Sequence, residues 1–236
     1  MPGSQTPAYR NLLLTALPSD DLAVLAPDLT FLDLPRRTQL ELPNKKIEHV
    51  YFMESGITSI VASTRPDAQV EVGIIGREGM TGLAVVHLAD RVPYSAYIQV
   101  SGSAYRIGAD AVRDVMERST EARRIFLAFA QGFQIQTAET AVANARATIE
   151  ERLARWLLMA QDRVESDEIH LTHEFLSLMM AARRPGVTES VNELARKGLI
   201  ETQRGVIIVI DRAGLEDRAG VYYGLPEKEL RRLLPR

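Results

Sequence analysis

The chain has 236 residues, of which 46% are hydrophobic, so it is long enough to bury the core of one or two domains. It contains no cysteine, which excludes disulfides, cysteine-ligated zinc and iron–sulfur clusters, and its net charge of −3 means that any contact with nucleic acid must come from a local basic patch. No apolar run approaches the roughly 20 residues that cross a bilayer, and residues 1–10 lack the apolar stretch of a signal peptide, so we expect a cytoplasmic protein without a membrane partner.

The N-terminal part of the chain predicts an antiparallel β-domain. A short apolar helix near residues 12–25 precedes several strand-like segments, which follow one another at intervals of about ten residues with turns between them. The alternation of polar and apolar residues over 69–72 suits a strand with one face buried and the other in solvent. We therefore expect a sandwich or roll. Its strands are residues 31–34, 38–42, 49–53, 57–64, 70–75, 96–100 and 104–107.

A long helical tract is predicted from about residue 109 to residue 164, since it contains no proline and has Gly132 as its interior weak point. A helix of about 30 residues spans about 45 Å, which is longer than a compact domain requires. A second copy often covers such a helix, so we expect one stripe of it to form a dimer interface, with the core of a single chain as the alternative. A bend is expected at residues 144–148. The interface residues, at approximately helical spacing, are Ile125, Phe129, Phe133 and Thr140.

Residues 171–200 carry the most informative pattern in the chain. Apolar residues at helical spacing predict two short helices, and the small residues Ala181 and Ala182 lie where the helices cross. Pro185 fits the first turn of the second helix, where its missing N–H removes no hydrogen bond. This arrangement is typical of a helix-turn-helix, which offers its second helix to the major groove of DNA. An ordinary pair of antiparallel helices is the alternative.

The segment after the second helix favours the DNA-binding interpretation. Residues 201–205 lead into the β-branched run 206–210, with Gly205 at the turn, which predicts a β-hairpin. A helix-turn-helix followed by a hairpin is a winged helix, and Arg204 lies at the tip of the wing, where it could contact a phosphate. Residues 144–236 carry equal numbers of basic and acidic residues, so only a local patch could bind DNA.

Catalytic and metal sites are not expected. The sheet region holds two histidines, His49 and His87, which are too few for a metal-dependent dioxygenase, and His170 and His173 have no carboxylate or sulfur partner at ligand spacing. The lone His87 is a weak basis for a haem ligand, so haem is not expected either. Neither a nucleophile motif nor a phosphate-binding glycine loop is present. We conclude from the sequence that the protein is not an enzyme.

The order of these segments resembles the Crp/Fnr superfamily of bacterial transcription regulators. The resemblance covers nearly the whole chain. Two features depart from the family pattern, since Ala181 stands at the turn position where glycine is usual and Ser190 stands where an aliphatic residue is common. The stretches that carry the resemblance are residues 49–52 with 54–56, Gly76 with 78–82, 152–158, and 171–172 through 183–188.

The resemblance implies an α+β fold with three parts. These are a β-roll sensor domain similar to cyclic-nucleotide-binding domains at residues 1–108, a long dimerisation helix with a hinge at 109–146, and a winged helix-turn-helix domain at 147–236. It implies a regulator that binds a palindromic operator in double-stranded DNA as a homodimer, with RNA polymerase as a candidate partner. The alternative is a protein–protein adaptor that has the shape of a regulator but has lost sequence-specific recognition of DNA.

By the same resemblance, the base-contacting positions of the second helix are Arg184, Pro185 and Glu189. We expect Arg184 to bind guanine O6 and N7 and Glu189 to accept from cytosine N4, while proline cannot donate. Contacts to phosphates or flanking groups are assigned to Thr172, His173, Arg183, Thr188 and Arg204.

The ligand site of the roll departs from the cyclic-nucleotide branch of the family. That branch binds the ribose hydroxyl with glutamate and the phosphate with an arginine–serine pair, whereas this chain aligns Leu83 and Tyr94-Ser95 with those positions. Cyclic AMP and cyclic GMP are therefore not expected, and no cofactor is, although Arg91 is a candidate shifted substitute. The expected effector pocket, for an unidentified and less charged molecule, contains Leu83, Tyr94 and Tyr97.

Overall fold

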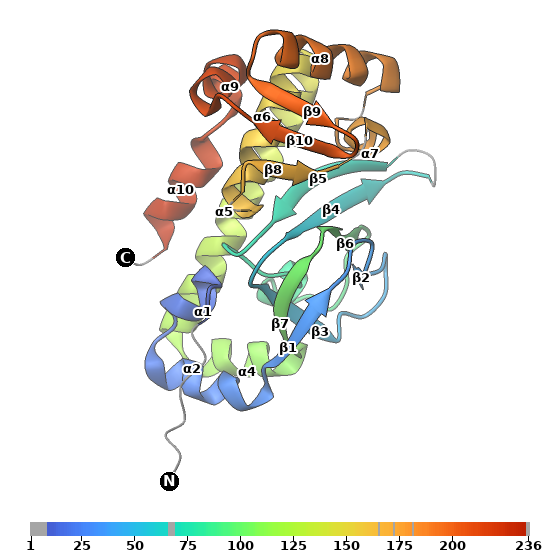
Figure 1. Cartoon of the computed structure of the whole chain (residues 1–236). Coiled ribbons are helices and arrows are strands. Elements are labelled where there is room, and N and C mark those ends of the chain that lie inside the picture. The colour runs from blue at the N-terminus through green and yellow to red at the C-terminus, as the bar shows by residue number, and fades with distance from the viewer. Residues whose placement is uncertain (1–8, 66–68, 165, 172, 181, 235–236) are drawn as a thin grey trace.

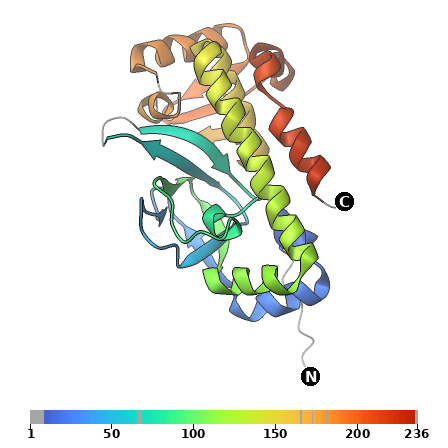
Figure 2. The ribbon, with the colours of Figure 1, turned by 180° about the vertical axis from the view of Figure 1, so that it is seen from behind.

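The computed structural model describes residues 9–65, 69–164, 166–171, 173–180 and 182–234, and of residues 173 and 174 it describes the backbone alone. The β-roll occupies one end of the molecule and the winged helix the other, and the long helix α5 runs along one side of both (Figures 1 and 2). This arrangement confirms the predicted order of β-roll, long helix and winged helix-turn-helix.

The chain begins with two helices where the sequence predicts one. Helix α1 (Leu12–Ala16) ends before Pro18, and α2 (Ser19–Leu25) follows it, because the residue that precedes a proline is disfavoured in helical conformation. The short 3₁₀ helix η1 (Ala26–Asp28) leads into the roll. Asn11 caps α1 by accepting from the N–H groups of Leu13 and Leu14, and its side chain also donates to the Met53 and Gly79 carbonyls.

The roll contains two antiparallel sheets. One has the order β1 (Thr30–Leu34), β7 (Gly102–Gly108), β3 (His49–Met53). The other has the order β2 (Gln39–Glu41), β6 (Ser95–Val100), β4 (Ile57–Ser63), β5 (Gln69–Ile75). The inner faces and the short helix α3 (Leu83–Val86) enclose an apolar core. Large side chains at its centre are Phe52, Met53, Met80, Ile98 and Ile107.

The helical tract bends after residue 146, as predicted, but it is also broken at Ser119, which the sequence analysis did not predict. Helix α4 (Ala109–Arg118) is followed by α5 (Thr120–Arg146), whose first turn is capped by the Ser119 hydroxyl, and extended backbone at Ala147 ends α5. Helix α6 (Ile149–Val164) begins with a capping box, because the Thr148 hydroxyl accepts from the Glu151 N–H while the Glu151 carboxylate accepts from the Thr148 N–H.

The C-terminal domain is a winged helix with an additional helical extension. Strand β8 (Glu168–His170), α7 (His173–Met179), α8 (Arg184–Arg196), β9 (Ile200–Gln203) and β10 (Val206–Val209) follow α6, and the sheet order is β8-β10-β9. The predicted hairpin thus has a third strand. Beyond it, α9 (Arg212–Ala219), η2 (Gly220–Tyr222) and α10 (Leu225–Leu233), which the sequence analysis did not predict, return to α5 (Figure 1).

The C-terminal domain also covers the outer face of the β2-β6-β4-β5 sheet. Ile57 and Ile74 of this sheet belong to the same buried cluster as Trp156 and Met179. At the edge of this contact, the ring of Phe175 in α7 lies 6.3 Å from the ring of Tyr97 in an edge-to-face arrangement. The central strands of the sheet are therefore buried on both faces.

Glu71 lies in the middle of this interdomain contact. The alternating sequence at residues 69–72 predicts a solvent-exposed face, but Glu71 is 4% exposed, so that prediction is wrong. Its carboxylate accepts from the Ser59 hydroxyl and, at 2.7 Å, from the Trp156 indole N–H. Burial raises the pKa of Glu71 to about 7, although these two hydrogen bonds and the charges of Arg155 and Arg163 lower it.

Candidate nucleic-acid interface

Helix α8 has one face buried in the domain and one in solvent. Val187, Val191 and Leu194 point inward and are nearly inaccessible, which holds the helix firmly on α6 and α7. Pro185 lies in the first turn, as predicted. Ser190 is also buried and donates to the Gly186 carbonyl at 2.9 Å, so a polar residue is accommodated at a position where an aliphatic one was expected.

The outer face of α8 forms a continuous open surface that points away from the roll (Figure 1). Arg184 is exposed and forms no ion pair with another described residue, so its guanidinium is available to a ligand. Arg196 is instead paired with Glu193 at 2.7 Å on the same helix. The surface is formed by Arg184, Pro185, Thr188, Glu189, Asn192, Glu193 and Arg196.

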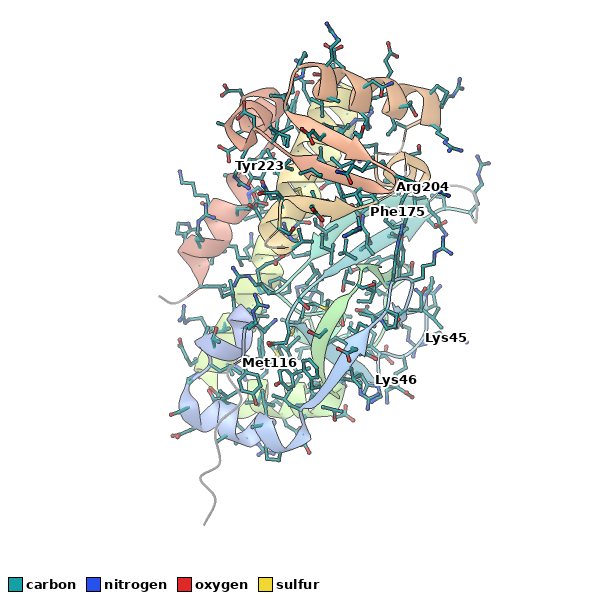
Figure 3. The ribbon with its side chains drawn as sticks, viewed as in Figure 1. Lys45, Lys46, Met116, Phe175, Arg204 and Tyr223 are labelled. Carbon is teal, nitrogen blue, oxygen red and sulfur yellow. The ribbon has the colours of Figure 1, made fainter. Side chains whose placement is uncertain are left out.

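The predicted DNA-contacting residues lie in two groups. Arg183, Arg184 and Glu189 are exposed at the start and on the outer face of α8, and Thr188 is half-buried beside them. Arg204 is exposed at the tip of the wing, where Gly205 adopts a left-handed conformation (Figure 3). The predictions for Thr172 and for the His173 side chain lie outside the described residues.

Asn192 is a residue of this surface that the sequence analysis missed. It lies four residues after Thr188 and eight after Arg184, and this spacing places all three on one side of a helix. Arginine can bind guanine through two hydrogen bonds, asparagine can bind adenine in the same way, and glutamate can accept from cytosine. The outer face therefore offers three side-chain types that distinguish bases.

The residues predicted to form the dimer interface lie against the rest of their own chain. Ile125 and Phe129 are 0% and 2% exposed in the single chain, so they have no surface left for a partner. Phe133 is half-buried, and a Cβ added at Gly73 would lie 2.8 Å from its ring. Thr140 accepts from the Arg155 guanidinium at 3.1 Å. We correct the assignment of Ile125 and Phe129, which their own chain already covers, whereas Phe133 and Thr140 contact their own chain and remain partly exposed.

The predicted effector pocket is also corrected. Tyr94 lies in the bend just before β6, whereas Tyr97 lies within β6. Tyr94 packs on the roll core, to which the buried Leu83 belongs, whereas Tyr97 packs on Phe175 of the winged helix. The structure does not bring the three residues together.

A carboxylate from β2 lies at the start of the helix in the segment aligned with the cyclic-nucleotide cassette. The backbone N–H of Gly82, just before α3, donates to Glu41 Oε1 at 2.7 Å, and Glu41 is buried. Arg91 is at the surface and is bound by Asp90 at 2.9 Å.

The described part of the chain offers neither a metal cluster nor a membrane span. Within it, no three histidine, aspartate or glutamate side chains are grouped as a metal ion would need. No described helix combines the length and the apolar character that crossing a bilayer requires.

Comparisons with known proteins agree with this geometry. Residues 151–218 match the Crp-like helix-turn-helix domain. Similar solved structures include FixK2 from Bradyrhizobium japonicum, with 14% identity, a TM-score of 0.71 and 82% of this chain covering 98% of that one. A CRP-family transcriptional regulator from Thermus thermophilus has 19% identity and a TM-score of 0.66 over 80% of this chain and 96% of that one.

A protein assigned to the Crp/Fnr family from Eubacterium rectale has 15% identity and a TM-score of 0.68 over 88% of this chain and 97% of that one. The sequence has no match among curated proteins. The chain thus has the fold of Crp/Fnr regulators, and its C-terminal domain is of the Crp-like helix-turn-helix type.

Proposed function

Because residues 151–218 form a Crp-like helix-turn-helix domain, we propose that the chain is a transcriptional regulator that reads a palindromic DNA operator as a homodimer. The observation that carries this proposal is the open outer face of α8, where an unpaired arginine, an asparagine and a glutamate project from a helix whose other face is fixed in a core. RNA polymerase is a candidate partner of such a dimer.

The exposed face of α5 supports the homodimer. Six exposed residues follow one another at alternating spacings of four and three, which is the repeat of a two-stranded coiled coil. Leu127 is 42% exposed, and three alanines would let two helices approach closely. We call these residues the α5 stripe. They are Leu127, Gln131, Gln134, Ala138, Ala141 and Ala145.

Selection of bound fragments from a random DNA pool, at a stated salt concentration, tests the proposed function. We expect a palindrome whose half-sites are about 34–36 Å apart, since two winged helices related by a twofold axis meet the same side of the duplex. Replacement Arg184→Ala should weaken binding by about 1–3 kcal/mol and relax the preference at one base position. Arg196→Ala is the matched control, because Arg196 is already paired with Glu193.

One outcome of these measurements would change the role of Arg184, and another would contradict the proposed function. Uniform weakening across all sequences after Arg184→Ala would place Arg184 among the phosphate contacts. A pool without any selected sequence would instead favour a protein–protein adaptor with a regulator's shape.

We further propose that the regulator does not bind cyclic AMP or cyclic GMP. A phosphate at the start of α3 would meet the Glu41 carboxylate, and Leu83 offers the ribose hydroxyl no acceptor. An unpaired phosphate in the roll interior would cost several kcal/mol, which is enough to remove a micromolar affinity. Isothermal titration with each nucleotide up to millimolar concentration should give no saturable heat. A dissociation constant near the micromolar range would show that this chain builds its phosphate site from other residues.

A further inference from the structure

A cavity of about 290 Å³ lies where the C-terminal extension meets the rest of the molecule. Its walls come from α5, α10, the end of α6 and the loop after β5, so it touches both domains and the long helix that connects them. The volume is just below the range of about 300–1,000 Å³ that is usual for small-molecule sites. This cavity is lined by none of the residues assigned above to DNA contact, to the α5 stripe or to the predicted effector pocket.

The cavity has an apolar body. The aromatic rings of Phe129 and Phe133 line it from α5, and Pro226, Leu230 and Leu234 line it from α10 and its end. Gly132 lies between the two phenylalanines, and a Cβ there would be 2.9 Å from Leu230 Cδ1. A flat or compact apolar molecule would contact this surface on two sides.

Most polar groups at the rim are already bound by neighbours. Arg163 donates to Glu78 at 2.7 Å and to the Met159 carbonyl at 2.7 Å. Asp162 accepts from Arg212 at 2.9 Å and from the Tyr223 hydroxyl at 2.6 Å. These groups have little remaining capacity for a ligand.

Glu227 is different. Both oxygens of its carboxylate are buried, and neither accepts a hydrogen bond from a described residue. A buried acceptor without a donor is costly, and a carboxylate can only accept. The charge itself is balanced through space, because Glu227 interacts electrostatically with the buried guanidinium groups of Arg155 and Arg163. Arg77, Arg163 and Arg231 already line the cavity, so a cationic ligand would add to positive charge that is present there, whereas a neutral donor would supply only the missing hydrogen bond.

We propose that this cavity binds a small neutral molecule that has an apolar body and an N–H or O–H group directed at the Glu227 carboxylate. The site needs no DNA and does not depend on the proposed function. Since α10 and α5 form opposite walls, a bound molecule would contact the C-terminal extension and the long helix at the same time.

Isothermal titration of the full chain with indole and indene tests the proposal. The two probes have nearly the same shape and apolar surface, but only indole carries an N–H. We expect indole to bind about tenfold or more tightly than indene, because a hydrogen bond to a charged acceptor adds that much affinity. Equal affinity of the two probes, or no binding of either up to millimolar concentration, would overturn the proposal.

Three variants locate the site. Glu227→Leu should remove the difference between the probes, whereas Glu229→Leu, on the same helix but outside the cavity, should preserve it. Leu234→Trp leaves the carboxylate in place and fills the cavity, so it should weaken the binding of both probes. This variant locates the site even if Glu227→Leu shows no cooperative thermal unfolding and is therefore not folded. A difference between the probes that survives Glu227→Leu would mean that they bind elsewhere.

Discussion

Replacing Ala138 by aspartate is expected to convert the protein from a dimer to a monomer and to abolish operator binding. Ala138 is exposed near the middle of the α5 stripe. In a dimer of the variant, the two aspartate carboxylates would therefore lie close together in the proposed interface. Burial of unpaired like charges costs several kcal/mol. A monomer also loses the gain of about 10²–10⁴ in affinity that two linked half-site contacts supply. Light scattering at micromolar concentration and operator titration measure the two effects.

Ala89→Asp is the matched control, because Ala89 is exposed on a loop outside the stripe and should leave the dimer intact. A strictly monomeric unmodified protein would reject the symmetric model. A variant that remains a dimer would place the seam on another surface. Phe133→Asp does not address the question, since Phe133 packs against Gly73 of its own chain and its replacement should destabilise the fold.

Glu71 is expected to have a large effect on how the free energy of unfolding depends on pH. The pKa of Glu71 is about 7 in the folded chain and is 4.5 for an unperturbed glutamate. The folded state therefore holds this proton more tightly than the unfolded state. The stabilisation that protonation provides is complete below about pH 4.5 and is lost as the pH rises through about 7. Its full size is about 3.5 kcal/mol, since one pKa unit corresponds to about 1.4 kcal/mol.

Denaturant unfolding at pH 5 and pH 8 measures this contribution. Glu71→Gln keeps an acceptor for the Trp156 indole and removes the charge, so it should reduce the loss of stability between the two pH values. Glu117→Gln, at an exposed position, should retain the full loss. Trp156 is the single tryptophan of the chain, and its emission should change with a midpoint near pH 7 in the native protein and stay constant in Glu71→Gln. The same midpoint in Glu71→Gln would assign the titration to another group.

The sequence predicted the helices, strands and turns better than it predicted which parts of the molecule pack against each other. The winged helix followed from apolar spacing, Pro185 and Gly205, which are properties of a few neighbouring residues. The stripe through Ile125 and Phe129 was correctly predicted to be buried, but a period of 3.6 shows only that a face is covered, and here the roll covers it. The α5 stripe, where we propose the dimer interface, lies on another face of the helix.

Glu71 and Glu227 could not be found in this way. A charged residue on an alternating strand normally marks solvent, and only the docked C-terminal domain buries Glu71. Glu227 belongs to α10, a short helix whose position depends on packing against α5 over a long sequence separation.

The burial of β4 and β5 on both faces limits how far the two domains can evolve as separate modules. A winged helix that recombines onto another roll would meet an outer face that lacks Ile57, Ile74 and the Glu71 carboxylate. Substitutions in these strands must satisfy two cores at once, and drift on one side requires compensation on the other. Chimeras of this chain should therefore be joined so that the sheet and the domain that covers it come from the same parent.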